Sequence, residues 1–286
     1  MLKLNTILAP VDFSDRSLAT AEHAVHMANH FGAKLILAHV KPLVPGYYGG
    51  YVPSAQQELD AYSREEISNL VKKVTIGKAI ETVILEGDSA QRIEQLIQER
   101  NVDLVMMATH GYGTFRKFLV GSVTAKVLHD ARCPVFTGAH VPEVAKFNTE
   151  PYKRVACAID LKEHSETVLR WASEFAAAWE ADLILIHAAP VLGSDGIYTG
   201  FFPADARDML VGHAQIEIEK LCGKMGINPE VHVESAEVAS YVKGIADEAY
   251  ADIVVIGRSP DRDVLGRLRT HAYALIRESP CPVISI

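Results

Sequence analysis

The stretch A-T-H-G-Y-G-T-F-R-K-F-L-V-G-S-V-T, residues 108–124, has the residue types and spacing of an anion-binding loop. It follows the apolar run V-D-L-V-M-M, which is typical of a buried strand. Glycine permits positive φ and close approach of the main chain to a ligand. A strand, a glycine-bearing loop and the start of a helix together present backbone N–H groups to phosphate. The stretch therefore predicts a phosphate cradle, provided that the rest of the chain positions it.

The sequence of 286 residues contains an internal repeat, in which the second half resembles the first with a shift of about half the length. T-I-L-A-P-V-D, ending at Asp12, returns as R-V-A-C-A-I-D, ending at Asp160. F-G-A-K-L-I-L-A-H-V returns as W-E-A-D-L-I-L-I-H-A, which places His39 over His187. The repeat predicts two domains of similar fold, which we place at residues 1–142 and 151–286.

Each half alternates short apolar runs with amphipathic stretches. In the first half, runs without polar alternation occupy residues 6–11, 34–40, 81–86, 104–108 and 134–138. Such runs suit parallel strands that are covered on both faces. Between the first two, Leu18, Ala21, Val25 and Ala28 form one helical stripe, with Ser14 where an N-cap belongs. The pattern predicts two tandem doubly wound α/β domains, each with a five-stranded parallel sheet.

In an open α/β sheet, ligands bind beyond the carboxyl ends of the strands, where the strand order reverses. Asp12 follows the first strand, and Met107 and Ala108 end the fourth. If these strands are neighbours, Asp12 and the glycine loop share one crevice. There the carboxylate can accept a hydrogen bond from an adenine amino group or a ribose hydroxyl. The alternative is that Asp12 only caps the first helix, a role with a similar sequence preference.

Composition limits the classes of function. The net charge of −8 lies entirely in residues 149–286 and argues against nucleic acid as a partner, since binding phosphate backbones requires a basic face. No apolar run is long enough to span a membrane, so no membrane association is expected. The N-terminus reads as a first strand and not as a signal peptide, and four cysteines without C-x-x-C spacing favour the cytoplasm.

The pattern A108-T-H-G111, then nine residues, then G121-S122 resembles the G-x-x-G-x9-G-[S/T] nucleotide loop of the universal stress protein family. The resemblance extends over nearly the whole chain, twice. It implies adenine-nucleotide-hydrolase-like sheets, packed through their last strands as an intrachain pseudo-dimer, and ATP with Mg²⁺ as the ligand. The sequence departs from the family pattern at Ala108, where the first glycine is expected, and this methyl group would crowd the ribose or the α-phosphate.

The resemblance also implies which residues contact the nucleotide. Adenine and ribose would be met by Pro10, Val11, Asp12 and Val40, beside Met107 and Ala108 at the strand end. The phosphates would be met by Gly111, Gly121, Ser122 and Val123, with His110 and Thr124 close by.

The second half has lost parts of this loop. Its counterpart, residues 257–271, reads G-R-S-P-D-R-D-V-L-G-R-L-R-T-H. Pro260 replaces the second glycine and removes one N–H, and Thr270 and His271 replace Gly121 and Ser122. We therefore expect a degenerate site and one ATP per chain.

Three functions stay open on the sequence. A nucleotide-dependent regulator of the stress response is favoured over a slow ATPase or phosphotransferase, because no acidic pair for metal is evident near the loop. The third is a nucleotide-free scaffold. A homodimer and protein partners are left open, as is the role of the Tyr- and Gly-rich segment at residues 41–53.

Several histidines and cysteines are interpreted as structural. His23, His26 and His30 are predicted to lie on a solvated face opposite the apolar stripe, without a metal. His39 and His187 are expected to pack at strand ends. Cysteines beside the last strand of each half, at Cys133 and Cys281, are expected to act as small buried hydrophobes.

Overall fold

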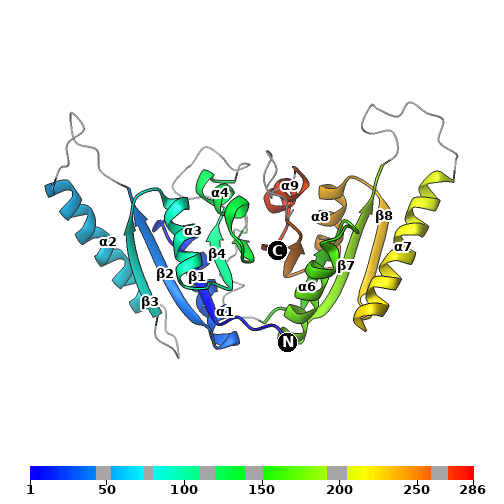
Figure 1. Ribbon diagram of the computed structural model, residues 1–286, viewed down its shortest axis with the longest axis horizontal. Helices are drawn as coiled ribbons and strands as arrows, with labels where there is room; N and C mark the ends of the chain where they lie inside the picture. The colour runs from blue at the N-terminus through cyan, green and yellow to red at the C-terminus, as the bar shows by residue number, and fades with distance from the viewer. Residues whose placement is uncertain (43–52, 74–79, 110–119, 139–150, 192–204, 259–269) are drawn as a thin grey trace. The chain divides into compact units, whose positions relative to one another are not determined.

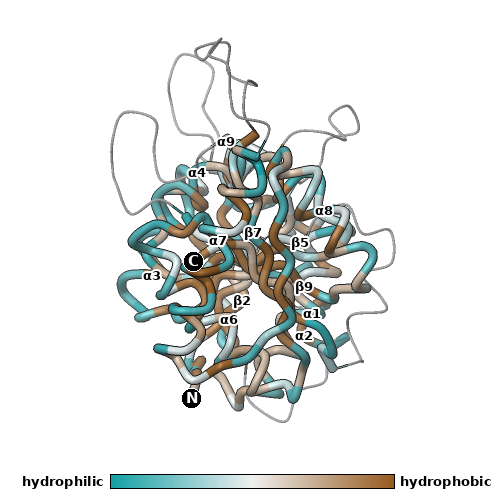
Figure 2. The backbone as a smooth tube through the Cα atoms, turned by 90° about the vertical axis from the view of Figure 1, so that its right-hand side faces the viewer, coloured by the Kyte–Doolittle hydropathy of each residue, from teal (hydrophilic) through white to brown (hydrophobic). Residues whose placement is uncertain are grey.

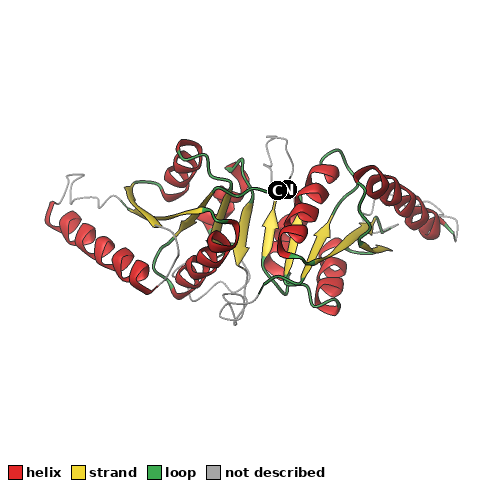
Figure 3. Ribbon diagram, turned by 90° about the horizontal axis from the view of Figure 1, so that it is seen from below, coloured by secondary structure: helices red, strands yellow, loops and turns green. Residues whose placement is uncertain are grey.

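The computed structural model describes residues 1–42, 53–73, 80–109, 120–138, 151–191, 205–258 and 270–286. The chain forms two compact units, one of Lys3–Glu150 and the other of Pro151–Ile286 with Met1–Leu2. In each unit, helices cover both faces of a parallel sheet (Figures 1 and 3). The predicted tandem α/β fold is confirmed.

The first unit carries its elements in the predicted order. Its strands are β1 (Thr6–Pro10), β2 (Lys34–Lys41), β3 (Ile80–Glu86), β4 (Leu104–Ala108) and β5 (Val135–Gly138). Its helices are α1 (Asp15–Phe31), α2 (Pro53–Lys73), α3 (Ser89–Glu99) and α4 (Ser122–Asp130). The strand order is β3-β2-β1-β4-β5.

The second unit repeats this arrangement. Its strands are β6 (Arg154–Ala158), β7 (Asp182–Ala189), β8 (Glu230–Ser235), β9 (Ile253–Ile256) and β10 (Val283–Ser285). Its helices are α6 (Ser165–Trp179), α7 (Ala206–Met225), α8 (Val238–Glu248) and α9 (Thr270–Glu278). The order β8-β7-β6-β9-β10 matches that of the first unit, element for element.

The strand order reverses beside β1, which pairs in parallel with both β2 and β4. Ile7 is opposite Leu35 on one side and Leu104 on the other. Because all three strands run the same way, Asp12 and Ala108 emerge at the same edge of the sheet. This is the edge at which open α/β sheets bind ligands.

The strands form the core of each unit, and they are the most hydrophobic segments of the chain (Figure 2). Ile7, Leu8 and Leu104 have no exposed surface, as expected for strands that are covered on both faces. Helix α1 begins at the predicted cap, where Ser14 Oγ accepts a hydrogen bond from Ser17 N. It ends at Gly32, which adopts the left-handed conformation (φ 63°) that glycine tolerates without strain.

The predicted solvated histidine face of α1 is wrong. His23 is buried, with 2% of its surface exposed, and its ring stacks on Phe136 of β5 at a centroid distance of 5.1 Å. His26 is half-buried and only His30 is exposed. The sheet extends past α1 to β5, so the helix buries a wider face than the stripe of Ala21, Val25 and Ala28 predicted.

Neither a membrane-spanning helix nor a cluster of metal ligands occurs in the described ranges. No helix there is long and apolar enough to cross a membrane. No group of three or more His, Cys, Asp or Glu side chains there could hold a metal ion.

Candidate functional site

A cavity of about 240 Å³ opens at the carboxyl edge of the first sheet, between the ends of β1, β2 and β4 and the starts of α3 and α4. Its apolar lining comes from all three strand ends and from the first turns of α3. The residues that form this lining are Pro10, Val11, Ala38, Val40, Met107, Ala108 and Ile93. A flat apolar ligand fits such a lining, and a few polar groups at its edge would orient it.

Asp12 lies at this edge as an exposed carboxylate, and it is not the cap of α1. Its Oδ1 accepts hydrogen bonds from Ser14 N at 3.0 Å and Ser14 Oγ at 2.6 Å. Its own N–H donates to Ser17 Oγ at 3.3 Å. Within the described residues, Oδ2 has no hydrogen-bond partner and remains available as an acceptor. The turn therefore fixes the carboxylate while leaving one oxygen for a ligand.

The end of β1 is further held by His39 of β2. Nδ1 of His39 donates to the carbonyl oxygen of Val11 at 2.8 Å, which fixes the tautomer with a proton on Nδ1. Phe13 adopts a left-handed conformation (φ 65°) and packs on the His39 ring at a centroid distance of 4.3 Å. A bulky residue with positive φ is strained and persists only where its surroundings hold it. Asp12 thus lies between two residues that are fixed to the sheet.

Helix α4 begins at the opposite side of the cavity. The two ends of the glycine loop meet there, because Gly121 N donates to Thr109 O at 2.7 Å. Thr124 Oγ1 donates to Ala108 O at 2.8 Å and so ties the first turn of α4 to the end of β4. These contacts place the start of the helix against the strand end, beside the apolar lining.

Among the residues that the structure describes, no side chain caps α4. The N–H groups of Ser122, Val123 and Thr124 have no hydrogen-bond partner among the described residues. By contrast, Ser14 caps α1 and Asp88 caps α3. An uncapped helix N-terminus presents unsatisfied donors and the positive end of the helix dipole, which together bind anions.

Gly121 differs from the expectation of a left-handed glycine. It has φ −60° and ψ 149°, which any residue can adopt, and its N–H is already donated within the loop. The need for glycine at this position is therefore not conformational. What a side chain here would change is the space beside the first turn of α4.

The cavity brings together every predicted site residue that the structure describes. Its lining includes Pro10, Val11, Asp12, Val40, Met107, Ala108, Gly121, Ser122, Val123 and Thr124. His110 and Gly111 lie outside the described residues. The sequence interpretation missed Ser17, Ala38, Ser89 and Ile93. Ser89 and Ile93 could have been found, because α3 also starts at the carboxyl edge of the sheet.

The second unit retains the aspartate turn after its first strand with one change. Asp160 Oδ1 accepts from Lys162 N and Ser165 Oγ, both at 3.1 Å, as Asp12 does from its own turn. His187 Nδ1 donates to Ile159 O at 2.9 Å, as His39 does to Val11. The change is that the Lys162 ammonium lies 3.6 Å from Asp160 Oδ2, the oxygen that is available in Asp12. The loop residues 259–269, including Pro260, lie outside the described residues.

The second unit also suggests where the methyl group of Ala108 points. A Cβ added at the equivalent Gly257 would lie 3.1 Å from Cγ2 of Val168 in α6. By the repeat, Val168 corresponds to Thr20 of α1. We therefore expect the Ala108 methyl group to face α1.

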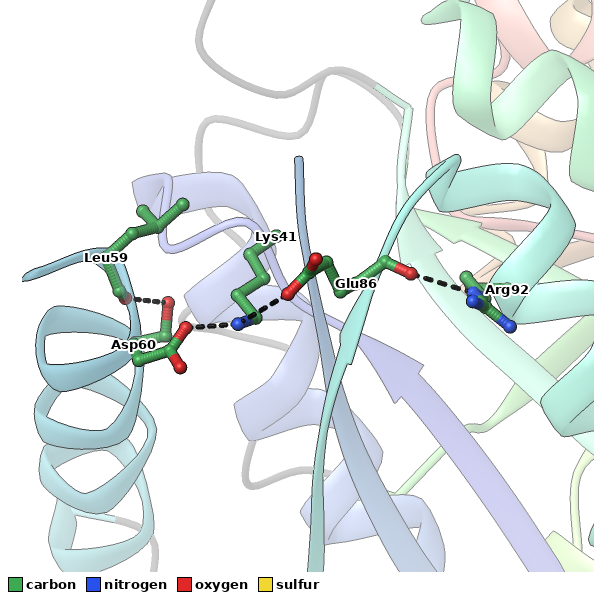
Figure 4. A network of polar contacts seen from close by, with 6 residues as sticks. Lys41, Leu59, Asp60, Glu86 and Arg92 are labelled. Carbon is green, nitrogen blue, oxygen red and sulfur yellow. Dashed lines mark hydrogen bonds and ion pairs between the residues drawn. The ribbon is translucent and has the colours of Figure 1, made fainter. Parts of the chain in front are cut away.

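A buried lysine fixes the end of β2, next to the cavity residue Val40. The Lys41 ammonium is paired with Asp60 of α2 and with Glu86 of β3, the latter at 2.9 Å, and 9% of its side chain is exposed (Figure 4). Arg92 Nε donates to the carbonyl oxygen of Glu86 at 2.8 Å. The hydrogen bonds to Asp60 and Glu86 raise the pKa of Lys41, although burial opposes them. The network holds α2, β2 and β3 together at the edge where the cavity opens.

The four cysteines are all buried, and none forms a disulfide. Burial raises the pKa of Cys281 to about 12 and raises that of Cys157 further. Thiolates are disfavoured in such surroundings, which agrees with the predicted packing role.

Comparison with known proteins gives the same division of the chain. The sequence model of the Universal stress protein family matches residues 3–137 and again residues 151–286. A universal stress protein of Methanocaldococcus jannaschii is 32% identical over 134 residues, which cover 45% of this chain and 78% of that protein. One of Thermus aquaticus is 30% identical over 132 residues, covering 46% of this chain and 95% of that protein.

A crystal structure of a universal stress protein from Archaeoglobus fulgidus has a similar fold over the whole chain. It superposes with a TM-score of 0.70 at 24% identity, covering 99% of this chain and 96% of the other.

Proposed function

The chain belongs to the universal stress protein family, with two of its domains in tandem, and from this premise we propose that the first domain binds ATP with Mg²⁺. We infer that nucleotide occupancy makes the protein a regulator in the cytoplasmic stress response. The observation that carries the proposal is one cavity that joins an apolar lining, the Asp12 carboxylate and the uncapped start of α4.

The nucleoside would occupy the apolar side of this cavity. Adenine would pack against Pro10, Val40 and Met107, and Asp12 Oδ2 would accept a hydrogen bond from the base or the ribose. The fixed turn around Asp12 supports this role, because a preorganised acceptor loses less entropy on binding.

The phosphates would lie at the start of α4. The amides of Ser122, Val123 and Thr124 would donate to them, and the absence of a side chain at Gly121 would let them approach. Magnesium commonly binds through substrate phosphates and retains several waters, so it would arrive with the nucleotide. His110 and Gly111 belong to the adjoining loop and remain predicted phosphate contacts.

Calorimetric titration with Mg-ATP tests the proposal. We expect one site per chain, weakened by about 1–3 kcal/mol in Asp12→Ala through loss of a hydrogen bond in a partly dry site. Asp160→Ala, the matched change in the second domain, should leave binding unchanged. Two equivalent sites, or equal binding by wild type and Asp12→Ala, would contradict the proposal. Turnover of labelled ATP on the same protein distinguishes a regulator from a slow ATPase or phosphotransferase.

A further inference from the structure

Lys126 lies at the rim of the cavity, on α4 one turn after Ser122. Residues four apart share one face of a helix, and helical side chains lean toward the N-terminus. Lys126 therefore extends back toward the start of α4. Its Nζ lies 3.4 Å from Oδ1 of Asp88, the residue before the cavity residue Ser89.

Asp88 makes the two neighbouring helix starts different. Its carboxylate caps α3 by accepting from Gln91 N at 2.9 Å, and this bond and Lys126 hold the pKa of Asp88 below its usual value. The start of α3 thus contains a built-in anion, whereas no described side chain caps the start of α4. A phosphate bound at α4 would place a second anion beside the ammonium of Lys126.

The second domain shows that a carboxylate cap of this kind forms without a lysine at the position of Lys126. Glu237 caps α8 as Asp88 caps α3, accepting from Ala239 N at 3.0 Å and Ser240 N at 2.8 Å. Helices α4 and α9 begin at Ser122 and Thr270, so Ala274 stands in place of Lys126. The cap of α8 therefore forms without a lysine at the matching position of α9. In the first domain the lysine lies on the helix whose start borders the cavity.

The size of the cavity indicates which phosphates Lys126 would meet. Its volume of about 240 Å³ is below the roughly 300–1,000 Å³ typical of pockets that enclose a whole ligand. A nucleoside and its first phosphate would fill the cavity and the start of α4. The outer phosphates would then extend to the rim.

We propose that Lys126 is a specificity residue for the outer phosphates, so that the site prefers nucleoside di- and triphosphates to monophosphates. Asp88 holds the ammonium of Lys126 at the rim and competes with the phosphates for it. The inference rests on the proposed nucleotide function, and it adds that the site distinguishes nucleotides by the number of their phosphates.

Calorimetric titrations of the full chain with AMP, ADP and ATP, each with Mg²⁺, test this inference. Lys126→Gln should weaken the binding of ATP about tenfold and the binding of AMP by less than about twofold, because only the outer phosphates lose a charge-assisted contact. Lys126→Arg should restore ATP binding. Asp88→Asn keeps a capping oxygen, and it should strengthen ATP binding severalfold because it removes the charge that competes for Lys126.

Lys34→Gln is the matched control, since it removes an equally exposed, carboxylate-paired lysine from the opposite edge of the same sheet. It should leave all three affinities unchanged. A purely structural Lys126–Asp88 bridge predicts the same direction of change in Lys126→Gln and Asp88→Asn, and that result overturns the inference. So does an unchanged ratio of ATP to AMP affinity in Lys126→Gln. If wild type binds none of the three nucleotides, the proposed function itself is wrong and the inference with it.

Discussion

Nδ1 of His39 lies 2.8 Å from the carbonyl oxygen of Val11, the residue before Asp12. The same bond recurs between His187 and Ile159, before Asp160, at 2.9 Å. In both units the residue between the end of the first strand and the aspartate is therefore fixed by a histidine of the neighbouring strand. The residue after each aspartate, Phe13 or Leu161, has positive φ, so this tight turn is also common to both units.

His39→Ala should weaken Mg-ATP binding by about 1–2 kcal/mol, because it leaves the Val11 carbonyl without its donor and loosens the Asp12 turn. Calorimetric titration measures the loss, and thermal unfolding shows how much stability changes. His187→Ala should cost similar stability with no change in nucleotide affinity. Equal loss of affinity in both variants would mean that the histidines act only through the fold.

Gly121→Val should abolish Mg-ATP binding while the domain stays folded. The backbone at Gly121 (φ −60°, ψ 149°) suits valine, so the effect comes from the branched side chain filling the space for phosphate. Titration calorimetry tests the loss of Mg-ATP binding, and the midpoint of thermal unfolding tests whether the domain stays folded. Thr270→Val, at the first residue of α9 in the second domain, is the control. Full affinity for Mg-ATP in a folded Gly121→Val protein would show that the phosphates do not bind at the start of α4.

Lys41→Met should lower the free energy of unfolding by about 1–2 kcal/mol, because it removes the ammonium that bridges the Asp60 and Glu86 carboxylates. Arg207→Met is the comparison, since it breaks the exposed pair with Glu234 and should cost less than about 1 kcal/mol. Urea unfolding measures both values. Equal costs would show that burial of Lys41 does not strengthen its pairing.

The Lys41 contribution should also depend on pH. The pKa of Lys41 is raised in the folded protein above the roughly 10.4 of an unfolded lysine. Its stabilisation is therefore fully present below that value and is lost as pH rises through the folded pKa. The difference in unfolding free energy between wild type and Lys41→Met should shrink at strongly alkaline pH. A difference that grows there would contradict the sign of the shift.

The thiols of the native protein should not react with Ellman's reagent at neutral pH, and all four should react in denaturant. Their burial and the raised pKa values of Cys281 and Cys157 disfavour the thiolate that attacks the reagent. Absorbance of the released thiolate gives the count. Rapid reaction of one thiol in the folded protein would identify a reactive cysteine that the burial does not predict.

The sequence by itself determined the fold and most of the lining of the cavity. Strands covered on both faces leave unbroken apolar runs, and the repeat shows the same order of elements twice, so both could be read without coordinates. The position of Asp12 and of the Gly121 loop at strand ends followed from the rule that parallel strands share one carboxyl edge.

Tertiary structure decided what depends on neighbours that are distant in the sequence. The position of His23 on α1 predicts a solvated side chain, yet Phe136 of β5 stacks on its ring. The sequence of one helix does not show how far the sheet beneath it extends. Asp12 has the residue type of a cap, but Ser14 takes that role and leaves Oδ2 available. Lys126 and Asp88 are 38 residues apart, and only the packing of α3 beside α4 brings their opposite charges to the same rim.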